Sequence, residues 1–238
     1  MKLPSNFKTK IFADGADKTT MLRLYSDQRI QGFTTNPTLM RKAGITDYEA
    51  FARDMLAAIP DRSISFEVFA DDFSEMERQA RKIASWGENV YVKIPVMNTS
   101  GKPSLDLISH LTGAGVKVNV TALLTLAQVR DVASALKGGS PAYISVFAGR
   151  IADTGRDPVP MMAAAVELAV PCPNIELIWA SPRELLNVFQ ANAIGCHIIT
   201  ATSDILQKLD LVCKELTEYS LETVRMFYDD ARQSGFVL

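Results

Sequence analysis

The stretch VYVKIPV (90–96) places one lysine, Lys93, in the middle of a run of apolar and β-branched residues. Such a run is typical of a strand that is buried on both faces of a parallel sheet. Lysine is almost never fully buried without a reason. A desolvated lysine amine can attack a carbonyl carbon, and the alternative is a structural ion pair with a carboxylate such as Glu67. This strand alone does not distinguish a catalytic lysine from a structural ion pair.

Similar short runs lie on both sides of this stretch, and segments with helical spacing separate most of them. The seven other runs are KIFAD (10–14), QGFTT (31–35), SISFEV (63–68), VKVNV (116–120), YISVF (143–147), IELIWA (175–180) and CHIIT (196–200). Alternating strands and helices predict a parallel α/β sheet. Eight units in about 200 residues is the count of a (β/α)8 TIM barrel. The alternative is an open doubly wound sheet, whose nucleotide-binding forms lose support because the chain has no G-x-G-x-x-G or Walker A motif.

The composition agrees with a globular chain and excludes disorder, collagen and coiled coil. The 238 residues are 47% hydrophobic and 22% charged, with a formal net charge of −2. We expect one barrel domain over residues 1–238 and one more helix at about 220–234, which carries Leu221, Val224, Phe227 and Tyr228. Near-neutral charge gives no reason to bind nucleic acid. No apolar run approaches the roughly 18 residues of a membrane span and no signal peptide opens the chain, so we expect a cytoplasmic protein without a membrane partner.

Histidine and cysteine are scarce. The two histidines are His110 and His197, and the three cysteines are Cys172, Cys196 and Cys213. Chemistry that needs several histidines is therefore disfavoured, and the separated cysteines suggest neither a zinc site nor a disulfide framework. We expect all three cysteines to be small core residues, and His197 to be a core residue inside the eighth strand.

Polar residues follow the runs at their carboxyl ends, where barrel enzymes carry their active residues. They are Asp14, Thr34, Thr35, Asn36, Glu67, Lys93, Asn119, Thr121, Ser145, Arg150, Ser181 and Arg183. One such ending is routine, because strand ends carry caps and turns. A polar ending on seven strands in succession instead indicates a site.

Two pairs within this set suggest specific chemistry. Asp14 and Glu67 near an amine would shuttle protons, whereas the alternative for Asp14 is a helix N-cap. Arg150 and Arg183 suit a phosphate dianion. The alternatives for the arginines are ion pairs, of Arg150 with Asp153 and of Arg183 with Glu184 or Glu176.

Six motifs occur in order at these strand ends: FADGAD (12–17), GFTTNPTLM (32–40), VYVKIPV (90–96), VNVTALL (118–124), ISVFAGRI (144–151) and WASPRE (179–184). Together they resemble the transaldolase family in its short bacterial form, close to the fructose-6-phosphate aldolase group. The resemblance runs from about residue 10 to the C-terminus. The chain departs from the family pattern at Gly15 and Val146, neither of which supplies a catalytic group.

The resemblance implies a class I aldolase barrel that works without metal or organic cofactor. It makes Lys93 the Schiff-base nucleophile and Asp14 the acid–base group, with Glu67 and Thr121 positioning a water. The residues it implies for substrate binding are Thr34, Asn36, Asn119, Ser145 and Phe147 around the reacting carbons, and Arg150, Ser181 and Arg183 on the phosphate.

The implied activity is transfer of a dihydroxyacetone unit from sedoheptulose 7-phosphate or fructose 6-phosphate to glyceraldehyde 3-phosphate or erythrose 4-phosphate, as in the pentose phosphate pathway. Glu67 and Phe147 favour a transferase, because aldolase members tend to have Gln and Tyr there. The alternatives are an aldolase for fructose 6-phosphate, transfer on another anionic ketose such as a sulfonate, and a non-catalytic barrel. The resemblance also implies a homo-oligomer, a pentamer or decamer.

Overall fold

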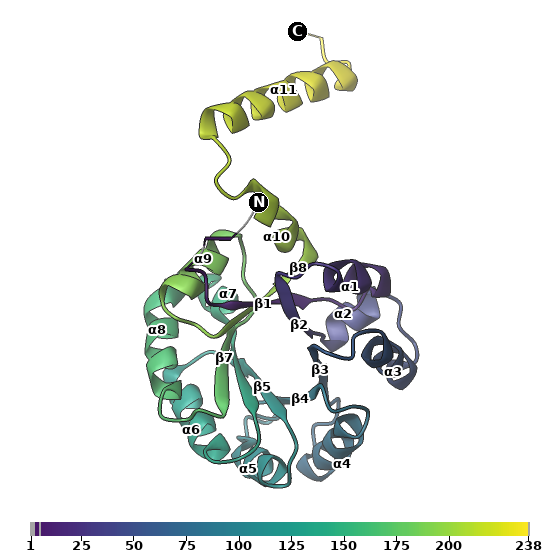
Figure 1. The fold of residues 1–238 in the computed structure, drawn as a ribbon, viewed down its shortest axis with the longest axis vertical. Coiled ribbons are helices and arrows are strands. Elements are labelled where there is room, and N and C mark those ends of the chain that lie inside the picture. The colour runs from purple at the N-terminus through teal and green to yellow at the C-terminus, as the bar shows by residue number, and fades with distance from the viewer. Residues whose placement is uncertain (1–2, 5, 238) are drawn as a thin grey trace.

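The structure, a computed structural model, describes residues 3–4 and 6–237. Within these residues, eight parallel strands form a closed barrel in chain order, with helices around it (Figure 1). The strands are β1 (Lys10–Asp14), β2 (Ile30–Thr34), β3 (Ser63–Glu67), β4 (Val90–Pro95), β5 (Val118–Leu123), β6 (Ala142–Val146), β7 (Ile175–Trp179) and β8 (Ile198–Thr202). Because β1 pairs with β8 along its whole length, the predicted (β/α)8 barrel is confirmed and the open sheet is excluded.

Helices connect the strands, and short polar side chains cap many of their first turns. They are α1 (Lys18–Tyr25), α2 (Pro37–Lys42), α3 (Tyr48–Ala58), α4 (Phe73–Ala84), α5 (Leu105–Gly113), α6 (Leu126–Leu136), α7 (Ala148–Ala152), α8 (Pro158–Ala169), α9 (Leu186–Ala193), α10 (Ser203–Gln207), the 3-10 helix η1 (Lys208–Leu211) and α11 (Leu216–Ser234). Asp17 caps α1 by accepting from the Thr20 amide. Asp14 is therefore left free of that capping role.

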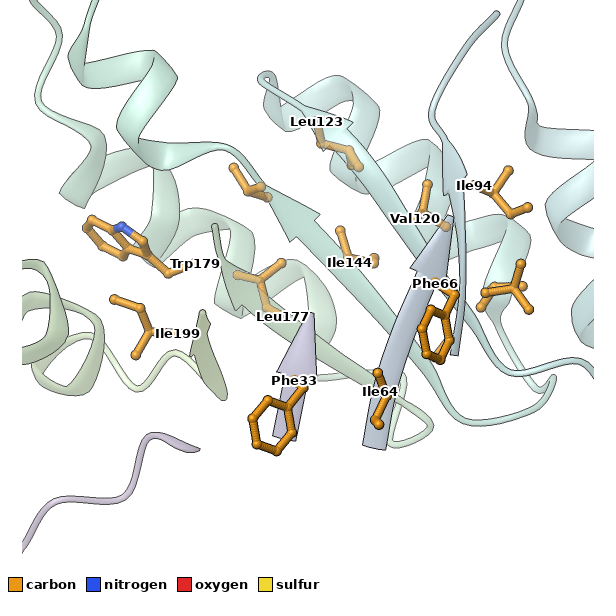
Figure 2. Packing of buried hydrophobic residues seen from close by; sticks show 14 of the residues in the cluster. Phe33, Ile64, Phe66, Ile94, Val120, Leu123, Ile144, Leu177, Trp179 and Ile199 are labelled. Carbon is orange, nitrogen blue, oxygen red and sulfur yellow. The ribbon is translucent and has the colours of Figure 1, made fainter. Parts of the chain in front are cut away.

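The main core lies between the sheet and the surrounding helices. Figure 2 shows part of it, including Phe33, Phe66, Val120, Leu177 and Trp179. A smaller apolar cluster fills the barrel interior, built around Phe12, Tyr143, Ile178, Ala180 and Ile198. Successive side chains point to opposite faces of a strand, so the residues between the outer-core positions face the barrel interior.

Strand β4 illustrates this alternation. Val90, Val92 and Ile94 belong to the outer core, whereas Tyr91 packs with the inner cluster. Lys93 is two residues beyond Tyr91 and therefore faces the interior too. The apolar run 90–96 thus buries a lysine inside the barrel, near its carboxyl end.

Two strands differ from the expected ranges by two or more residues at their ends, and the others differ by at most one. β5 runs over Val118–Leu123 rather than 116–120, and β8 over Ile198–Thr202 rather than 196–200. His197 therefore precedes β8 and is half-buried, so its placement inside the strand was wrong. Its Nδ1 accepts a hydrogen bond from the Leu177 amide at 3.1 Å, and burial lowers the pKa of His197. His197 thus accepts a backbone hydrogen bond from β7 just before β8 begins, and the apolar pattern of the sequence does not reveal this contact.

The cysteine prediction is confirmed for two residues and wrong for the third. Cys172 and Cys196 are buried, and Cys213 is exposed with a left-handed backbone in the turn before α11. Burial raises the pKa of Cys196 to about 12, so this thiol is unreactive.

The terminal helix α11 begins four residues before the expected position 220, with Glu215 as its N-cap. It stands away from the barrel in Figure 1, and none of the residues described in it is buried. No described helix combines the length and the apolar character that crossing a bilayer requires.

Candidate active site

A cavity of about 750 Å³ opens at the carboxyl ends of the barrel strands. All of the predicted site residues except Thr35 and Asn119 line it: Asp14, Thr34, Asn36, Glu67, Lys93, Thr121, Ser145, Phe147, Arg150, Ser181 and Arg183. They come from the ends of all strands except β8 and from the segments that follow. The residues that sequence reasoning selected one strand at a time thus meet in one place.

Lys93 is the buried cation of this cavity. Its side chain is only 8% exposed, and its Nζ lies 3.2 Å from Oε2 of Glu67. Nζ also donates a hydrogen bond to the Thr35 carbonyl at 2.9 Å. The ion pair offered as the alternative to a catalytic amine is therefore present. It does not exclude catalysis, because a carboxylate beside the amine is also a proton acceptor.

Asp14 lies at the end of β1, partly buried, and belongs to a small hydroxyl network. Thr34 Oγ1 donates to Asp14 Oδ1 at 2.7 Å, and Thr34 Oγ1 and Thr200 Oγ1 are 2.6 Å apart. Because the single Thr34 proton goes to Asp14, Thr200 is the donor of the second bond. Burial raises the pKa of Asp14 above its ordinary value, against the opposing effects of Lys93 and Thr34. A carboxyl group with a raised pKa is suited to exchanging protons near neutral pH.

Asn119 has a predicted role in substrate binding but does not line the cavity. It is fully buried, its Nδ2 donates to Ser65 Oγ at 3.0 Å, and its Oδ1 accepts from Ser145 Oγ at 2.7 Å. Ser145 does line the cavity. Asn119 therefore orients the Ser145 hydroxyl through this hydrogen bond without lining the cavity itself.

Tyr48 on α3 holds the end of β3 in place. Its hydroxyl accepts from the Glu67 amide at 2.8 Å and donates to the Glu67 carbonyl at 3.0 Å. Burial raises the pKa of Tyr48, which keeps this hydroxyl protonated. Both bonds fix the backbone of Glu67, and so the position of its carboxylate beside Lys93.

Two other predicted residues have distinct surroundings. Asn36 caps α2, with its Oδ1 accepting from the Leu39 amide at 2.9 Å, which leaves its Nδ2 for the cavity that it lines. The buried Oγ1 of Thr121 has no hydrogen-bond partner among the described residues. A buried hydroxyl without a partner is costly unless a water or ligand satisfies it.

The two arginines differ in their partners. Arg183 forms a bidentate ion pair with Asp153, with Nε 2.8 Å from Oδ1 and Nη2 in close contact with Oδ2. Asp153 raises the pKa of Arg183, and Arg183 lowers that of Asp153. The alternative pairings of Arg183 were wrong, since Glu176 pairs with Lys10 instead. Arg150 packs over the Phe147 ring, 5.8 Å from its centroid, and within the described residues no carboxylate pairs with it.

The backbone at the cavity rim is strained at two positions that line it. Ala122 and Ser181 both have a positive φ, of 67° and 59°. Residues with a side chain seldom adopt this conformation, and it persists where surrounding structure holds it. Strain of this kind clusters at functional sites.

Sequence reasoning missed several residues that line the cavity, among them the polar residues Thr38, Thr200, Thr202 and Asp204. Thr200 lies in the middle of β8, Thr202 ends the strand, and Asp204 follows it on α10. The expected strand 196–200 ends two residues before β8 does, so Thr202 and Asp204 lie beyond its predicted end, whereas Thr200 is its last residue and was not recognised as a site residue. The parallel pairing of Asp14 with Thr202 is the signal that locates this end.

The opposite end of the barrel holds a second cavity of about 730 Å³, lined by Phe12, Ser63, Tyr91 and Tyr143 among others. None of the predicted site residues lies there. Lys10, at its edge, is paired with Glu176. Across the described residues, no group of three His, Cys, Asp or Glu side chains is arranged to hold a metal ion.

The fold places the chain in the class of (β/α)8 barrels with a polar cavity at the carboxyl ends of the strands. A buried lysine lies beside a carboxylate at the carboxyl end of the strands, and arginines lie in the later part of the fold, where barrels bind phosphate.

Comparisons with known proteins identify the family within this class. Residues 11–237 match the sequence profile of the family described as "Transaldolase/Fructose-6-phosphate aldolase". A "Probable transaldolase" of Dehalococcoides mccartyi is 34% identical over 201 residues, which cover 84% of this chain and 89% of that protein. Another of a Thermoanaerobacter species is 32% identical over 227 residues, covering 95% and 98%. The chain belongs to the transaldolase/fructose-6-phosphate aldolase family.

Solved structures support the fold alone. A putative fructose-1,6-biphosphate aldolase from Coccidioides immitis superposes with a TM-score of 0.58 at 10% identity, over 83% of this chain and 74% of that one. A dihydrodipicolinate synthase from Rhodopseudomonas palustris gives 0.56 at 14% identity, over 84% and 72%.

Proposed function

We propose that the protein is a transaldolase, which moves a dihydroxyacetone unit from a ketose phosphate to an aldose phosphate through a Schiff base on Lys93. The observation that carries the proposal is the buried Lys93 amine, 3.2 Å from Glu67, in a cavity that also holds Asp14 and two arginines. A nucleophile, proton carriers and an anion site are the parts that this reaction needs.

The first step is imine formation. Lys93 Nζ loses a proton, for which Glu67 is the adjacent acceptor, and adds to the C2 carbonyl of the ketose. The resulting carbinolamine takes up a proton at its oxygen and loses water to give the iminium ion. A water held by Thr121 Oγ1, which lacks a protein partner within the described residues, would carry protons between Glu67 and the reacting oxygen.

The second step is cleavage of the bond between C3 and C4. Asp14 takes the proton of the C4 hydroxyl, the bonding electron pair moves into the iminium to form an enamine, and an aldose phosphate leaves. Thr34 and Thr200 hold the Asp14 carboxylate in position. The third step reverses the second with a different aldehyde, and hydrolysis of the new imine frees Lys93.

The remaining lining residues would hold the substrate. Asn36 Nδ2 and Ser145, itself oriented by Asn119, suit the hydroxyls of the three-carbon unit. Arg150, Ser181 and Arg183 suit the phosphate of the aldose, because guanidinium groups bind tetrahedral anions through charge-assisted hydrogen bonds. Transfer on a ketose with another tetrahedral anion, such as a sulfonate, is compatible with the same arginines.

The second candidate is aldol cleavage of fructose 6-phosphate with release of free dihydroxyacetone. That release needs protonation of the enamine. Phe147 lines the cavity without a hydroxyl that could donate a proton, which favours the transferase.

The test compares the two activities in one assay. With fructose 6-phosphate and erythrose 4-phosphate present, we expect sedoheptulose 7-phosphate to form. With fructose 6-phosphate alone, we expect dihydroxyacetone to appear far more slowly. Equal rates of the two processes would replace the transferase with the aldolase, and no turnover of either kind would favour the non-catalytic barrel.

We also propose that the protein acts as a homo-oligomer in the cytoplasm, where sugar phosphates are found. Terminal helix α11 presents Leu216, Leu221, Val224, Phe227 and Tyr228 within one stripe at helical spacing, and all are exposed. An apolar stripe of this kind is expected to dock on a neighbouring subunit.

A further inference from the structure

The anion end of the cavity contains an ion pair that the catalytic scheme does not use. Asp153, which directly follows α7, binds Arg183 with both carboxylate oxygens, although 30 residues separate the two in the chain. Asp153 is not among the residues that line the cavity, whereas Arg183 is. Asp153 therefore contacts Arg183 from outside the set of residues that line the cavity.

The bidentate contact determines which part of Arg183 is available. Asp153 occupies Nε and one hydrogen of Nη2. The guanidinium has five N–H donors, so three are left for another acceptor. A planar group held along one edge presents the remaining donors in a fixed direction.

The backbone of the same two segments is in close contact, which supports a built arrangement. A Cβ on Gly149 would lie 1.6 Å from the Ser181 carbonyl oxygen and 3.3 Å from Arg183 Nε. Asn187 on α9 adds a further contact, since its Oδ1 accepts from the Arg183 amide at 2.8 Å. The segment after β6 and the segment after β7 thus meet at two places, the Asp153–Arg183 ion pair and the Gly149–Ser181 contact, and Asn187 orders the second segment from within.

Both members of the ion pair are about half exposed, with 46% of the Arg183 and 52% of the Asp153 side chain accessible. An exposed pair contributes little to the stability of a fold. Its effect is expected to be on the orientation of Arg183.

We propose that Asp153 is a positioning residue that holds Arg183 toward the phosphate of the substrate, and so sets the preference for phosphorylated over unphosphorylated aldehydes. This inference rests on the proposed function. Removing the Asp153 carboxylate should therefore weaken binding of the phosphorylated acceptor. If Asp153 instead only competed with the phosphate for Arg183, removing its carboxylate would tighten binding.

The test measures KM and kcat of Asp153→Asn with fructose 6-phosphate as donor and either erythrose 4-phosphate or unphosphorylated glyceraldehyde as acceptor. We expect KM for erythrose 4-phosphate to rise about fivefold, as for the loss of one well-formed exposed ion pair. KM for glyceraldehyde, kcat and Tm should stay within experimental error. Asp153→Glu, which keeps the carboxylate, should restore part of the affinity.

Asp131→Asn is the matched control, because Asp131 also pairs with an exposed arginine, Arg130, but on α6 away from the cavity. It should change none of these quantities. An unchanged or lower KM for erythrose 4-phosphate in Asp153→Asn would overturn the positioning role, as would an equal rise for both acceptors. Failure of the proposed function is distinguishable, since the wild-type protein would then transfer nothing to either acceptor.

Discussion

At the residue scale, the decisive feature is that Lys93 satisfies both interpretations of a buried lysine. It is paired with Glu67 and hydrogen-bonded to the Thr35 carbonyl, and it also lines the one cavity that holds the predicted site residues. The apolar pattern of 90–96 predicted the burial correctly. The partner carboxylate was named from the sequence as a possibility, and the parallel pairing of Glu67 with Lys93 across β3 and β4 explains why the two meet.

The ionised Asp14 carboxylate is expected to lower the stability of the folded protein at neutral pH. Burial raises its pKa above the ordinary value of 3.8, so the folded protein binds this proton more tightly than the unfolded chain. The corresponding stability is present at low pH and is lost as the pH rises from about 4 through the folded-state pKa. Asp14→Asn has no carboxyl group to ionise, so it avoids this loss of stability at neutral pH. Its side-chain amide oxygen can still accept the hydrogen bond from Thr34. We expect its Tm at pH 7 to rise by about 2–4 °C for each kcal/mol regained.

The same variant should lower kcat by about 10²–10⁴, the usual contribution of an acid–base group. Thermal unfolding at pH 4 and pH 7, together with the rate of transfer, checks both parts. A Tm at pH 7 below that of the wild-type protein would contradict the expected sign, and a kcat within tenfold of wild type would remove Asp14 from the mechanism.

Arg150 is expected to carry the larger share of anion binding. Within the described residues Arg150 has no carboxylate partner, in contrast to Arg183. Arg150→Ala should weaken binding of a phosphorylated acceptor by about 1.5–3 kcal/mol for each charge-assisted hydrogen bond lost, and KM reports this loss. Phosphorylated and unphosphorylated acceptors affected to the same extent would argue against a phosphate contact.

At the scale of secondary-structure elements, the site depends on contacts between neighbouring strand-to-helix segments. The segment containing α7 approaches the segment after β7 so closely that only glycine fits at position 149. This approach is consistent with the left-handed backbone of Ser181. Two short segments far apart in sequence thereby form one end of the cavity.

Gly149→Ala tests this contact. The added methyl would overlap the Ser181 carbonyl, and overpacking of this kind costs about 1–3 kcal/mol or more. We expect lower stability in denaturant unfolding and a higher KM for phosphorylated acceptors. Gly113→Ala is the control, since nothing lies within 4 Å of its added Cβ and it ends helix α5. There alanine should be neutral or stabilise by up to about 1 kcal/mol. Equal effects of the two substitutions would refute the close approach.

Part of the site could be predicted from the sequence at the level of strands and helices. Strand identity followed from apolar runs, and the polar residues at their ends were found because barrel strands bring those ends together. Thr202 and Asp204 were missed because the predicted run 196–200 ends two residues before β8 does, whereas Thr200 is the last residue of that run and was not singled out as a polar strand ending. The pairing of Asp153 with Arg183, and the support of Glu67 by Tyr48, depend on helix placement that periodicity does not encode.

At the scale of the whole molecule, the barrel is closed and α11 lies outside it (Figure 1). The helix buries none of its described residues, so its apolar stripe is left without a partner in the part of the chain that the structure describes. Its existence was predictable from Leu221, Val224 and Phe227. Its detachment from the barrel was not, because amphipathic spacing does not say which surface an apolar face will meet.

Paired substitutions on α11 test the proposed assembly. Val224→Glu with Phe227→Glu places two charges on the apolar stripe, and we expect a shift to monomers in light scattering. Met226→Glu is the control, because Met226 lies on the opposite face at helical spacing and should leave the oligomer intact. A monomeric wild-type protein, or an oligomer that survives the double substitution, would rule out α11 as the subunit contact.

The central claim is that Lys93 forms a covalent imine with the substrate. The most direct measurement is incubation with fructose 6-phosphate, reduction with borohydride, and mass spectrometry of the digested protein. We predict a dihydroxyacetone-derived adduct on the peptide that contains Lys93, and its absence from Lys93→Ala. An adduct on a different lysine, or no adduct at all on the wild-type protein, would contradict the account.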